Sequence, residues 1–490
     1  MDLSPRAAVR LLLPRLPLIL KTALFNALSL SPNSSKQNLT TEVAVAFLRS
    51  ILRIRRPVLV LQRVSTRDPG IQGPILVSKV TIPAPNDESG PRDAVCSAIK
   101  ELGDGSETYT LPDYAAVEAE WTSYGRGISS AEPRPDRSEQ DHYQRLMEHT
   151  SSPVTILYFH GGAYFLMDPA TVREPISRLT KITGGRAFAV RYRLAPQAPF
   201  PAQLLDALIA YLSLLSPPPG SFHEPVPAQN IVLAGESAGA NLAIALLQLL
   251  LTLQRMGQGR IRFHGVDVPI QLPAGVAGNS PWTDITRSQP SINNNAHFDY
   301  LDPPSATGIS RAEPIPDAAW PASPPRAEIF CNASMMVHPL ASPLAAPPEL
   351  WKGMPPAFMC LGNEGLEDEI TVLARRMHQG GGVVDFVGYE GMPHCFAMIF
   401  PTSPAGRDCF VRWAKFCSGL VQGSGPTSSR AVWAEALSKP LRFKEVPMHR
   451  LTKLADHEVN DAMNRMQKHA MDREKEALEK WSEQQSKAKL

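Results

Sequence analysis

The chain has 490 residues, 43% of them hydrophobic and 20% charged. This is enough to bury a sizeable core in one large α/β domain with additions, or in two domains. The formal net charge of +2 argues against a nucleic-acid-binding surface.

The cysteines and the N-terminus bear on where the protein works. The six cysteines lack C-x-x-C spacing and are sparse for this length, so they predict neither a zinc site nor a disulfide framework. Leu11 to Leu20 is apolar, but Pro14, Arg15 and Pro17 interrupt it. It therefore fits neither a signal peptide nor a membrane span. We expect a cytoplasmic protein, and the basic, apolar first 60 residues leave peripheral contact with an intracellular membrane open.

Two helices are predicted ahead of the main domain. Leu16 to Leu30 and Thr40 to Arg55 carry apolar residues at helical spacing, and a loop rich in serine and asparagine separates them. We assign residues 1–60 to these helices and expect them to form part of a cap. Packing on the back of the sheet is the alternative.

Residues 61–425 are predicted to form the main domain. Ile75 to Ile82 and Tyr114 to Tyr124 are expected to be edge strands, with a polar linker over 83–105 between them and an exposed loop over 126–141 after them. From residue 154 to 255, apolar strands alternate with helices. The strands are expected at 154–159, 187–190 and 231–234, and the helices at 169–183, 201–215 and 238–253. This alternation predicts an α/β fold with a mostly parallel sheet and helices on both faces.

The second half of the domain continues the pattern around an interruption. Further strands are expected at 275–278, 357–361 and 383–389, and helices at 369–379 and 407–420. Between about 285 and 350 the periodicity fades and prolines are frequent, which indicates a cap insertion over the carboxyl end of the sheet. Residues 426–490 are predicted to be a charged helical tail.

A candidate nucleophile follows the strand at 231–234. Gly235-Glu236-Ser237-Ala238-Gly239 fits G-x-S-x-G and precedes a helix rich in alanine and leucine. This pattern is typical of a strained turn that presents the serine hydroxyl at its tip, with glycines where strand and helix come close. An ordinary glycine-rich turn is the alternative.

A base and an acid follow later strands in the order serine, acid, histidine. His394 lies after the strand at 383–389 and is the predicted general base. Glu364 is the acidic residue nearest the end of the strand at 357–361 and is the predicted orienting acid, with Asp368 as the alternative. Glu367 and Glu369 are expected in the solvated first turn of the next helix.

The remaining requirement for acyl transfer is a set of amide donors for the oxyanion. His160-Gly161-Gly162-Ala163 follows the strand at 154–159. Its small residues let the N–H groups of Gly161, Gly162 and Ala163 approach a substrate carbonyl, and the N–H of Ala238 completes the predicted oxyanion hole. His160 belongs to this loop, and His338 and His378 follow no strand, so these histidines fit the role of base less well.

Several stretches occur in a recognisable order over residues 150–420. They are 160–163, 192–196, 199–202, 235–239, 280–284, 342–343, 362–369 and His394. In these the chain resembles the hormone-sensitive-lipase-like (α/β-hydrolase fold-3) esterases. Residues 392–396 and the N-terminal helices are most similar to fungal members, including steryl-acetate and short-acyl ester deacetylases. Alanine stands at 163 where the family usually has a third glycine, and Glu364 where it usually has aspartate.

The resemblance implies an α/β-hydrolase sheet with a helical cap and no cofactor or metal ion. It also implies a serine hydrolase that cleaves short- to medium-chain carboxylic esters of a small molecule, such as a lipid or secondary metabolite, through an acyl-enzyme. The same residues would serve an amide or lactone hydrolase, and a ligand-binding member of the fold that lacks catalysis is a further alternative. The sequence leaves the substrate and the oligomeric state open.

Overall fold

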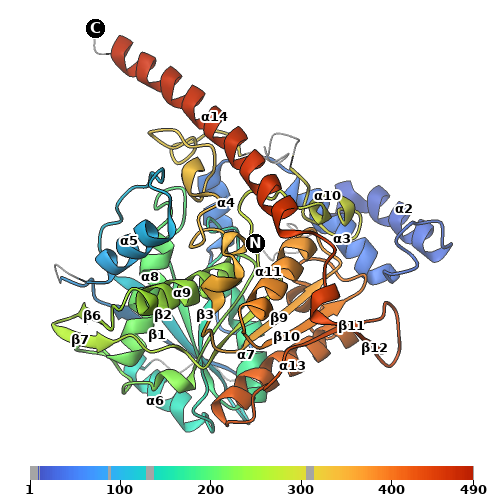
Figure 1. Ribbon diagram of the computed structural model, residues 1–490. Coiled ribbons are helices and arrows are strands. Elements are labelled where there is room, and N and C mark those ends of the chain that lie inside the picture. The colour runs from blue at the N-terminus through green and yellow to red at the C-terminus, as the bar shows by residue number, and fades with distance from the viewer. Residues whose placement is uncertain (1–8, 10, 87–89, 129–136, 305–313, 489–490) are drawn as a thin grey trace.

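The computed structural model describes residues 9, 11–86, 90–128, 137–304 and 314–488 (Figure 1). Its centre is a ten-stranded sheet with the order β1-β2-β4-β3-β5-β8-β9-β10-β11-β12. The strands are β1 (Ile75–Ile82), β2 (Val117–Tyr124), β3 (Thr155–Phe159), β4 (Arg186–Arg191), β5 (Ile231–Glu236), β8 (Gly275–Asn279), β9 (Ala357–Gly362), β10 (Val384–Tyr389), β11 (Arg430–Ala434) and β12 (Phe443–Glu445). Strands β4 to β11 of this order run parallel, whereas β1, β2 and β12 are antiparallel to their neighbours. The predicted mostly parallel sheet is confirmed.

Helices cover both faces because the central strands are apolar on both sides. In β3, Leu157 and Phe159 belong to one core, and Ile156 and Tyr158 belong to the other. The first core is closed by α5 (Pro91–Leu102), α8 (Ala202–Leu215), α9 (Ala238–Arg255) and α11 (Glu367–Gln379), and the second by α7 (Arg173–Thr183) and α13 (Pro404–Val421). Helix α9 is long and apolar enough to cross a membrane, but 89% of it is buried inside the protein, as in a core helix.

The region before β3 differs from the sequence-based expectation in three respects. Helix α5 lies inside the predicted linker, because Ala94, Val95 and Ala98 form a buried stripe that packs beside α9. Helix α6 (Glu139–Glu148) begins inside the predicted loop over 126–141, where the Ser138 side chain caps it; residues 129–136 lie outside the described part. Strand β2 pairs with both β1 and β4, so of the two predicted edge strands only β1 lies at an edge of the sheet.

The C-terminal region also differs from the prediction. The tail over 426–490 was predicted to be helical, but β11 pairs with β10 and β12 pairs with β11, so the sheet continues beyond residue 425. The short apolar segment around Ala431 and Val432 is buried in the sheet, which explains the difference. The charged helix follows as α14 (Asp456–Ala488), whose far end projects beyond the body of the molecule (Figure 1).

The insertion over 285–350 contains only short helices in its described part. They are α10 (Ser291–Asn294), η4 (Ala333–Met335), η5 (Pro343–Ala345) and η6 (Pro348–Trp351). Residues 305–313 of the predicted insertion lie outside the described part. The first half of α14 packs on η4, and Glu474 accepts hydrogen bonds from the amides of Ala327 and Ala333. The C-terminal helix therefore holds the insertion in place.

The described part of the N-terminal region forms a short 3-10 helix, Leu13–Arg15, and three α-helices, α2 (Leu16–Ala27), α3 (Leu39–Leu52) and α4 (Val58–Ser65). Helices α2 and α3 are the helices predicted from the sequence, and they lie side by side as a hairpin at the edge of the molecule (Figure 1). Asn38 caps α3 by accepting a hydrogen bond from the amide of Thr41 at 2.9 Å.

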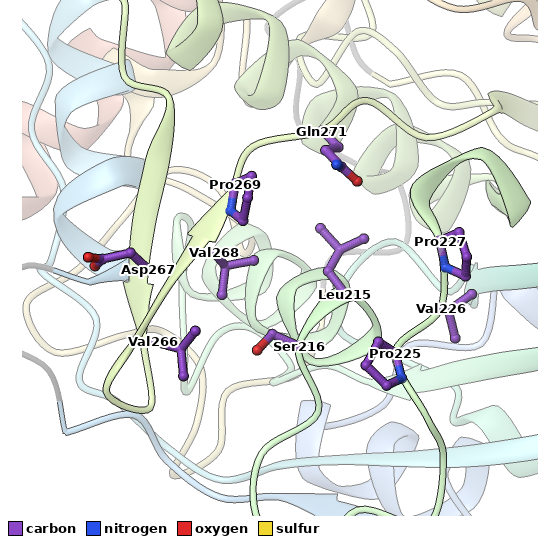
Figure 2. Close-up of a pocket in the computed structure, with 10 residues that line it drawn as sticks. All are labelled: Leu215, Ser216, Pro225, Val226, Pro227, Val266, Asp267, Val268, Pro269 and Gln271. Carbon is purple, nitrogen blue, oxygen red and sulfur yellow. The ribbon is translucent and has the colours of Figure 1, made fainter.

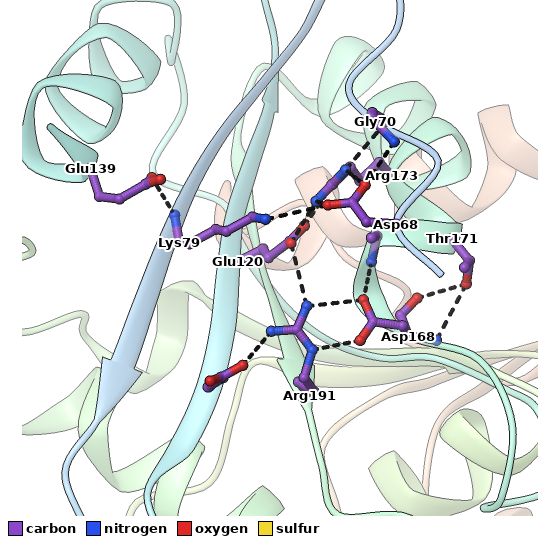
Figure 3. Close-up of polar contacts among 11 residues, drawn as sticks. Asp68, Gly70, Lys79, Glu120, Glu139, Asp168, Thr171, Arg173 and Arg191 are labelled. Carbon is purple, nitrogen blue, oxygen red and sulfur yellow. Dashed lines mark hydrogen bonds and ion pairs between the residues drawn. The ribbon is translucent and has the colours of Figure 1, made fainter. Parts of the chain in front are cut away.

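An ion-pair network joins the segment after α4 to the sheet (Figure 3). Arg173 on α7 is 3% exposed and binds both Asp68 and Glu120, at 2.6 and 2.7 Å. Arg191 at the end of β4 binds Asp168 at 2.5 Å and Glu118 at 2.6 Å. The Arg173 guanidinium lowers the pKa of Asp68 well below its usual value, although burial opposes this. Each buried charge thus has a partner, as burial of a charge requires.

Candidate active site

Ser237 lies in a strained turn between β5 and α9. Its φ of 53° is positive, a region that non-glycine residues rarely adopt. A β-carbon on Gly235 or Gly239 would collide with the carbonyl oxygen of Phe159 on β3. The glycines thus allow strand and helix to approach closely, and the turn directs the Ser237 hydroxyl towards the loop after β10.

The structure brings Ser237, His394 and Glu364 into one hydrogen-bonded chain. His394 Nε2 is 3.0 Å from Ser237 Oγ, and His394 Nδ1 is 2.7 Å from Glu364 Oε1. A carboxylate can only accept, so Nδ1 carries a proton in this contact and the neutral ring keeps Nε2 free to accept from the serine hydroxyl. The three side chains come from turns that follow β5, β9 and β10, which end at the same edge of the sheet.

The four acidic residues after β9 have separate partners. Asp368 accepts a hydrogen bond from the Ser291 amide at 2.7 Å, so it is the neighbour of α10 and not of His394. Glu367 binds the side chains of Asn295 and Asn363. Glu369 is 2% exposed and accepts from the amide of Thr283 at 2.6 Å. The prediction that Glu369 is solvated is therefore wrong, because it binds the backbone after β8.

His394 has an unusual electrostatic environment. Burial lowers the pKa of its imidazole, but the adjacent Cys395 sulfur and the Glu364 carboxylate outweigh burial and raise the pKa above its usual value of 6.5. Cys395 Sγ lies 3.4 Å from Nε2, on the side of the ring that faces Ser237. The environment stabilises the imidazolium form, which is the form that results when the imidazole removes a proton from a serine hydroxyl.

The glycine-rich loop after β3 lies directly against Ser237. A β-carbon on Gly161 would come 3.3 Å from the β-carbon of Ser237. Gly162 and Ala163 both have positive φ values, 95° and 52°. Within the part of the chain that the structure describes, the amides of Gly162, Ala163 and Ala238 donate no hydrogen bond to protein. They are free to donate to a ligand.

Gly161 differs from the other predicted oxyanion donors. Its amide donates to Glu236 Oε1 at 2.7 Å, so it is occupied, and the prediction of Gly161 as a donor is wrong. Glu236 Oε2 accepts from the Tyr158 hydroxyl at 2.5 Å. Burial raises the pKa of Glu236 to about 7, although these two hydrogen bonds oppose the shift. Glu236 therefore holds the first glycine of the loop in place beneath the site.

Two further residues support the site and were not predicted. Ser280 donates to Glu364 Oε2 at 2.6 Å, and its oxygen accepts from the Cys395 amide at 3.0 Å. Asp299 is fully buried and accepts from the amides of His394 and Gly365, at 3.2 and 2.8 Å. Ser280 follows the end of β8, a signal that could have found it. Asp299 lies in the insertion, where no local pattern marks it.

The other histidines have partners away from Ser237. His160 stacks on Tyr192 with ring centroids 4.3 Å apart, and burial lowers its pKa to about 4, so it is neutral. His338 Nε2 lies 3.0 Å from the carbonyl oxygen of Ile99, and His378 Nδ1 lies 3.0 Å from Ser429 Oγ. The structure therefore brings only His394 of these four to the serine.

Neither a metal cluster nor the pocket in Figure 2 bears on this site. Among the described residues, no group of three or more histidine, cysteine, aspartate and glutamate side chains is placed to hold a metal ion. Figure 2 shows a pocket between the end of α8 and the separate hairpin of β6 (Arg260–Phe263) and β7 (Val266–Pro269). None of its ten lining residues belongs to the predicted site.

Comparison with known proteins identifies the family. A model of an α/β-hydrolase-fold family matches residues 156–398, which span the loop after β3, the serine turn and His394. An acetyl-hydrolase of Streptomyces hygroscopicus is 32% identical over 257 residues, or 52% of this chain and 71% of that protein. The chain belongs to this α/β-hydrolase family.

A further relative and a solved structure are similar to this α/β-hydrolase. The versiconal hemiacetal acetate esterase of Emericella nidulans is 33% identical over 274 residues, or 56% of this chain and 82% of that protein. A crystal structure of an esterase/lipase from an uncultured bacterium has 22% sequence identity and a TM-score of 0.49, and the match covers 77% of this chain and 98% of that one.

Proposed function

We propose that this α/β-hydrolase is a serine esterase that hydrolyses carboxylic esters through an acyl-enzyme. The observation that carries the proposal is the chain of hydrogen bonds from Ser237 through His394 to Glu364 beside the unpaired amides of Gly162 and Ala163. This arrangement has a nucleophile, a base, an acid that orients the base, and donors for an oxyanion.

The proposed reaction has two halves. His394 Nε2 removes the hydroxyl proton as Ser237 Oγ bonds to the ester carbonyl carbon, and the amides of Gly162, Ala163 and Ala238 bind the resulting oxyanion. The alcohol then leaves with the proton from His394, and Ser237 keeps the acyl group. In the second half, His394 removes a proton from water, the hydroxide attacks the acyl carbon, and the acid leaves as Ser237 regains its proton.

Each supporting residue acts on one of these partners. Glu364 fixes the imidazole tautomer and stabilises the imidazolium, and Ser280 and the Gly362 amide hold the second carboxylate oxygen of Glu364 at 2.6 and 3.0 Å. Asp299 binds the His394 amide and thus positions the backbone of the base. No step requires a cofactor or metal ion.

The substrate that we propose is an acetyl or other short acyl ester of a small molecule. An acetyl-hydrolase and an acetate esterase are among the relatives, and each is covered over more than two thirds of its length. Deacetylation of a lipid, such as a steryl acetate, or of a secondary metabolite falls within this class. Amides and lactones react through the same intermediates, so a substrate panel must include them.

Hydrolysis of p-nitrophenyl acetate and p-nitrophenyl butyrate tests the proposal. We expect turnover by the wild-type protein and a loss of about 10⁴–10⁶-fold in kcat for Ser237→Ala. A fluorophosphonate probe should label wild-type protein at Ser237 and leave the variant unlabelled. Folded wild-type protein that neither turns over these esters nor reacts with the probe would instead be a ligand-binding member of the fold.

A further inference from the structure

Helix α2 is joined to α3 by polar side chains at its two ends and has its leucines outside. Arg15, just before the helix, donates to Ser50 Oγ on α3 at 2.8 Å, and Asn26 near its end donates to Glu42 Oε2 on α3 at 2.5 Å. The opposite side carries Leu16, Leu20 and Leu24 at four-residue spacing, which are 46%, 60% and 56% exposed. A helix packed on a protein in water normally has the reverse arrangement.

The apolar surface extends beyond this ridge. The other large apolar residues in and beside α2 that are more than a third exposed are Leu12, Leu13, Leu18, Phe25, Leu28 and Leu30. No residue of α2 is buried. An apolar patch of this kind on a protein surface indicates a site of interaction with another apolar phase or partner.

The charge of the same segment is strongly positive. Residues 11–67 contain nine lysines and arginines and one acidic residue, whereas the whole chain contains 49 and 47. The single acidic residue, Glu42, is 8% exposed and is bound by the side chains of Asn26 and Ser31. Lys21, Arg56, Arg63 and Arg67 are exposed. The segment that carries the apolar face is thus basic, Lys21 on α2 itself is exposed, and the segment has no exposed acidic residue.

From these observations we infer that the outer face of α2 docks this protein onto a lipid bilayer with anionic headgroups. Leucines on a helix that lies in the interface enter the acyl region, and surrounding basic side chains bind the headgroups. A second copy of the chain would bring two equally basic segments together, which like charges oppose. An anionic bilayer supplies both the apolar phase and the opposite charge.

The loop and the helix that follow α2 are hydrogen-bonded to segments next to the site. The loop after α2 places Gln37 so that its Nε2 donates to the carbonyl oxygens of Phe298 and Gly391, at 2.8 and 2.9 Å. Arg49 on α3 donates to the carbonyl oxygen of Asp299 through Nε at 3.1 Å. Asp299 binds the His394 amide, and Gly391 precedes His394 by three residues. The hairpin that carries the docking face is therefore hydrogen-bonded to the segments that position the base.

Sedimentation with vesicles tests the inference on the full chain. We expect wild-type protein to bind vesicles of phosphatidylcholine with 30% phosphatidylglycerol, and to bind pure phosphatidylcholine at least tenfold more weakly. Added 0.5 M salt should weaken binding to the anionic vesicles, because it screens charge attraction. The triple variant Leu16→Ser, Leu20→Ser, Leu24→Ser should lose at least tenfold in binding to the anionic vesicles.

A matched control replaces three other exposed apolar residues, away from α2, in the variant Val266→Ser, Leu437→Ser, Leu478→Ser. It should bind vesicles like wild type. Wild-type protein that does not bind anionic vesicles, or binding that the α2 variant retains, would overturn the inference. Dimers that the α2 variant abolishes, without vesicle binding, would also overturn it and make a second copy the partner.

The vesicle measurement is independent of turnover, so it is decided whether or not the proposed esterase activity is found. The α2 variant replaces no residue of the site and should hydrolyse p-nitrophenyl acetate at the wild-type rate in the absence of vesicles. Loss of that rate together with vesicle binding would indicate that α2 supports the fold of the site, which would overturn a purely interfacial role.

Discussion

At the carboxyl edge of the sheet, Ser237, His394 and Glu364 lie among packed side chains, and Glu364 is fully buried. In the α2–α3 hairpin, by contrast, hydrogen bonds between the helices occupy the polar groups and the leucines lie outside. In both regions, hydrogen bonds within the protein hold particular polar side chains in place. At the sheet edge these hydrogen bonds fix the geometry of three reacting groups. In the hairpin they leave a ridge of exposed leucines on the outer surface.

The comparison implies that substitutions in the two regions should affect different measurements. Changes at the site should alter rate constants or the stability of the fold, because each group there has a buried partner whose loss leaves a polar group or a cavity. Substitutions on the outer face of α2 should weaken binding to a lipid bilayer and leave the rate constants and the stability nearly unchanged, because the replaced atoms contact little protein.

Among the substitutions that compare the two regions, the largest effect is expected at the acid. Glu364→Gln should lower kcat by about 10³–10⁴-fold, because a glutamine amide can donate to Nδ1 and hold the imidazole in the wrong tautomer. Asp368→Asn is the matched control, since Asp368 binds the Ser291 amide instead of His394. Steady-state kinetics with p-nitrophenyl acetate would distinguish them, and equal losses in the two variants would contradict the assignment of Glu364.

A pair of leucines compares the two regions in stability. Leu361 on β9 is fully buried three residues before Glu364, and Leu361→Ala should lower the free energy of unfolding by about 2–5 kcal/mol. Leu24 on α2 is 56% exposed, and Leu24→Ala should change it by less than about 0.5 kcal/mol. Urea unfolding without lipid measures both values. A large loss for Leu24→Ala would show that α2 is part of the folded core.

Glu236 offers a test of the loop beneath the site. Glu236→Leu leaves the Gly161 amide and the Tyr158 hydroxyl without their acceptor, at a cost of about 1–3 kcal/mol for each unpaired group. Unfolding measurements should show this loss, and kcat should fall because the loop that carries Gly162 and Ala163 is no longer held. Glu236→Gln keeps an acceptor oxygen for Gly161 and should retain most of both properties. If both variants behave like wild type, Glu236 does not position the loop.

The smallest effect is expected in the pH dependence of kcat/KM, whose acidic midpoint should lie above 6.5. His394 must be neutral to accept the serine proton, and its pKa is raised, so kcat/KM should fall about tenfold per pH unit below a midpoint above 6.5. The charged groups that face the ring are Glu364 and Asp299, with Cys395 beside Nε2. Glu236 also titrates near pH 7. The acid limb should therefore persist in Glu236→Gln; its disappearance there would assign the limb to Glu236.

The sequence by itself predicted the fold and the three side chains that meet at the site, with Asp368 left as the alternative acid. Ser237, Glu364 and His394 each occur directly after an apolar strand, and parallel strands bring such positions to one edge of a sheet. The alternation of strands and helices between residues 154 and 255 is a local pattern, so it could be predicted from the sequence alone. The helices over residues 16–30 and 40–55 could be predicted for the same reason.

Only the tertiary structure decided which neighbours these groups have. It brought Glu364 and not Asp368 to His394. It also paired the Gly161 amide with the Glu236 carboxylate. Asp299, which lies 95 residues before His394 in the chain, binds the His394 amide. It also decided that α2 has its leucines outside. The physical reason is that hydrogen-bond partners and buried faces are set by contacts between distant segments, whereas hydrophobic periodicity reports only that a segment has an apolar side.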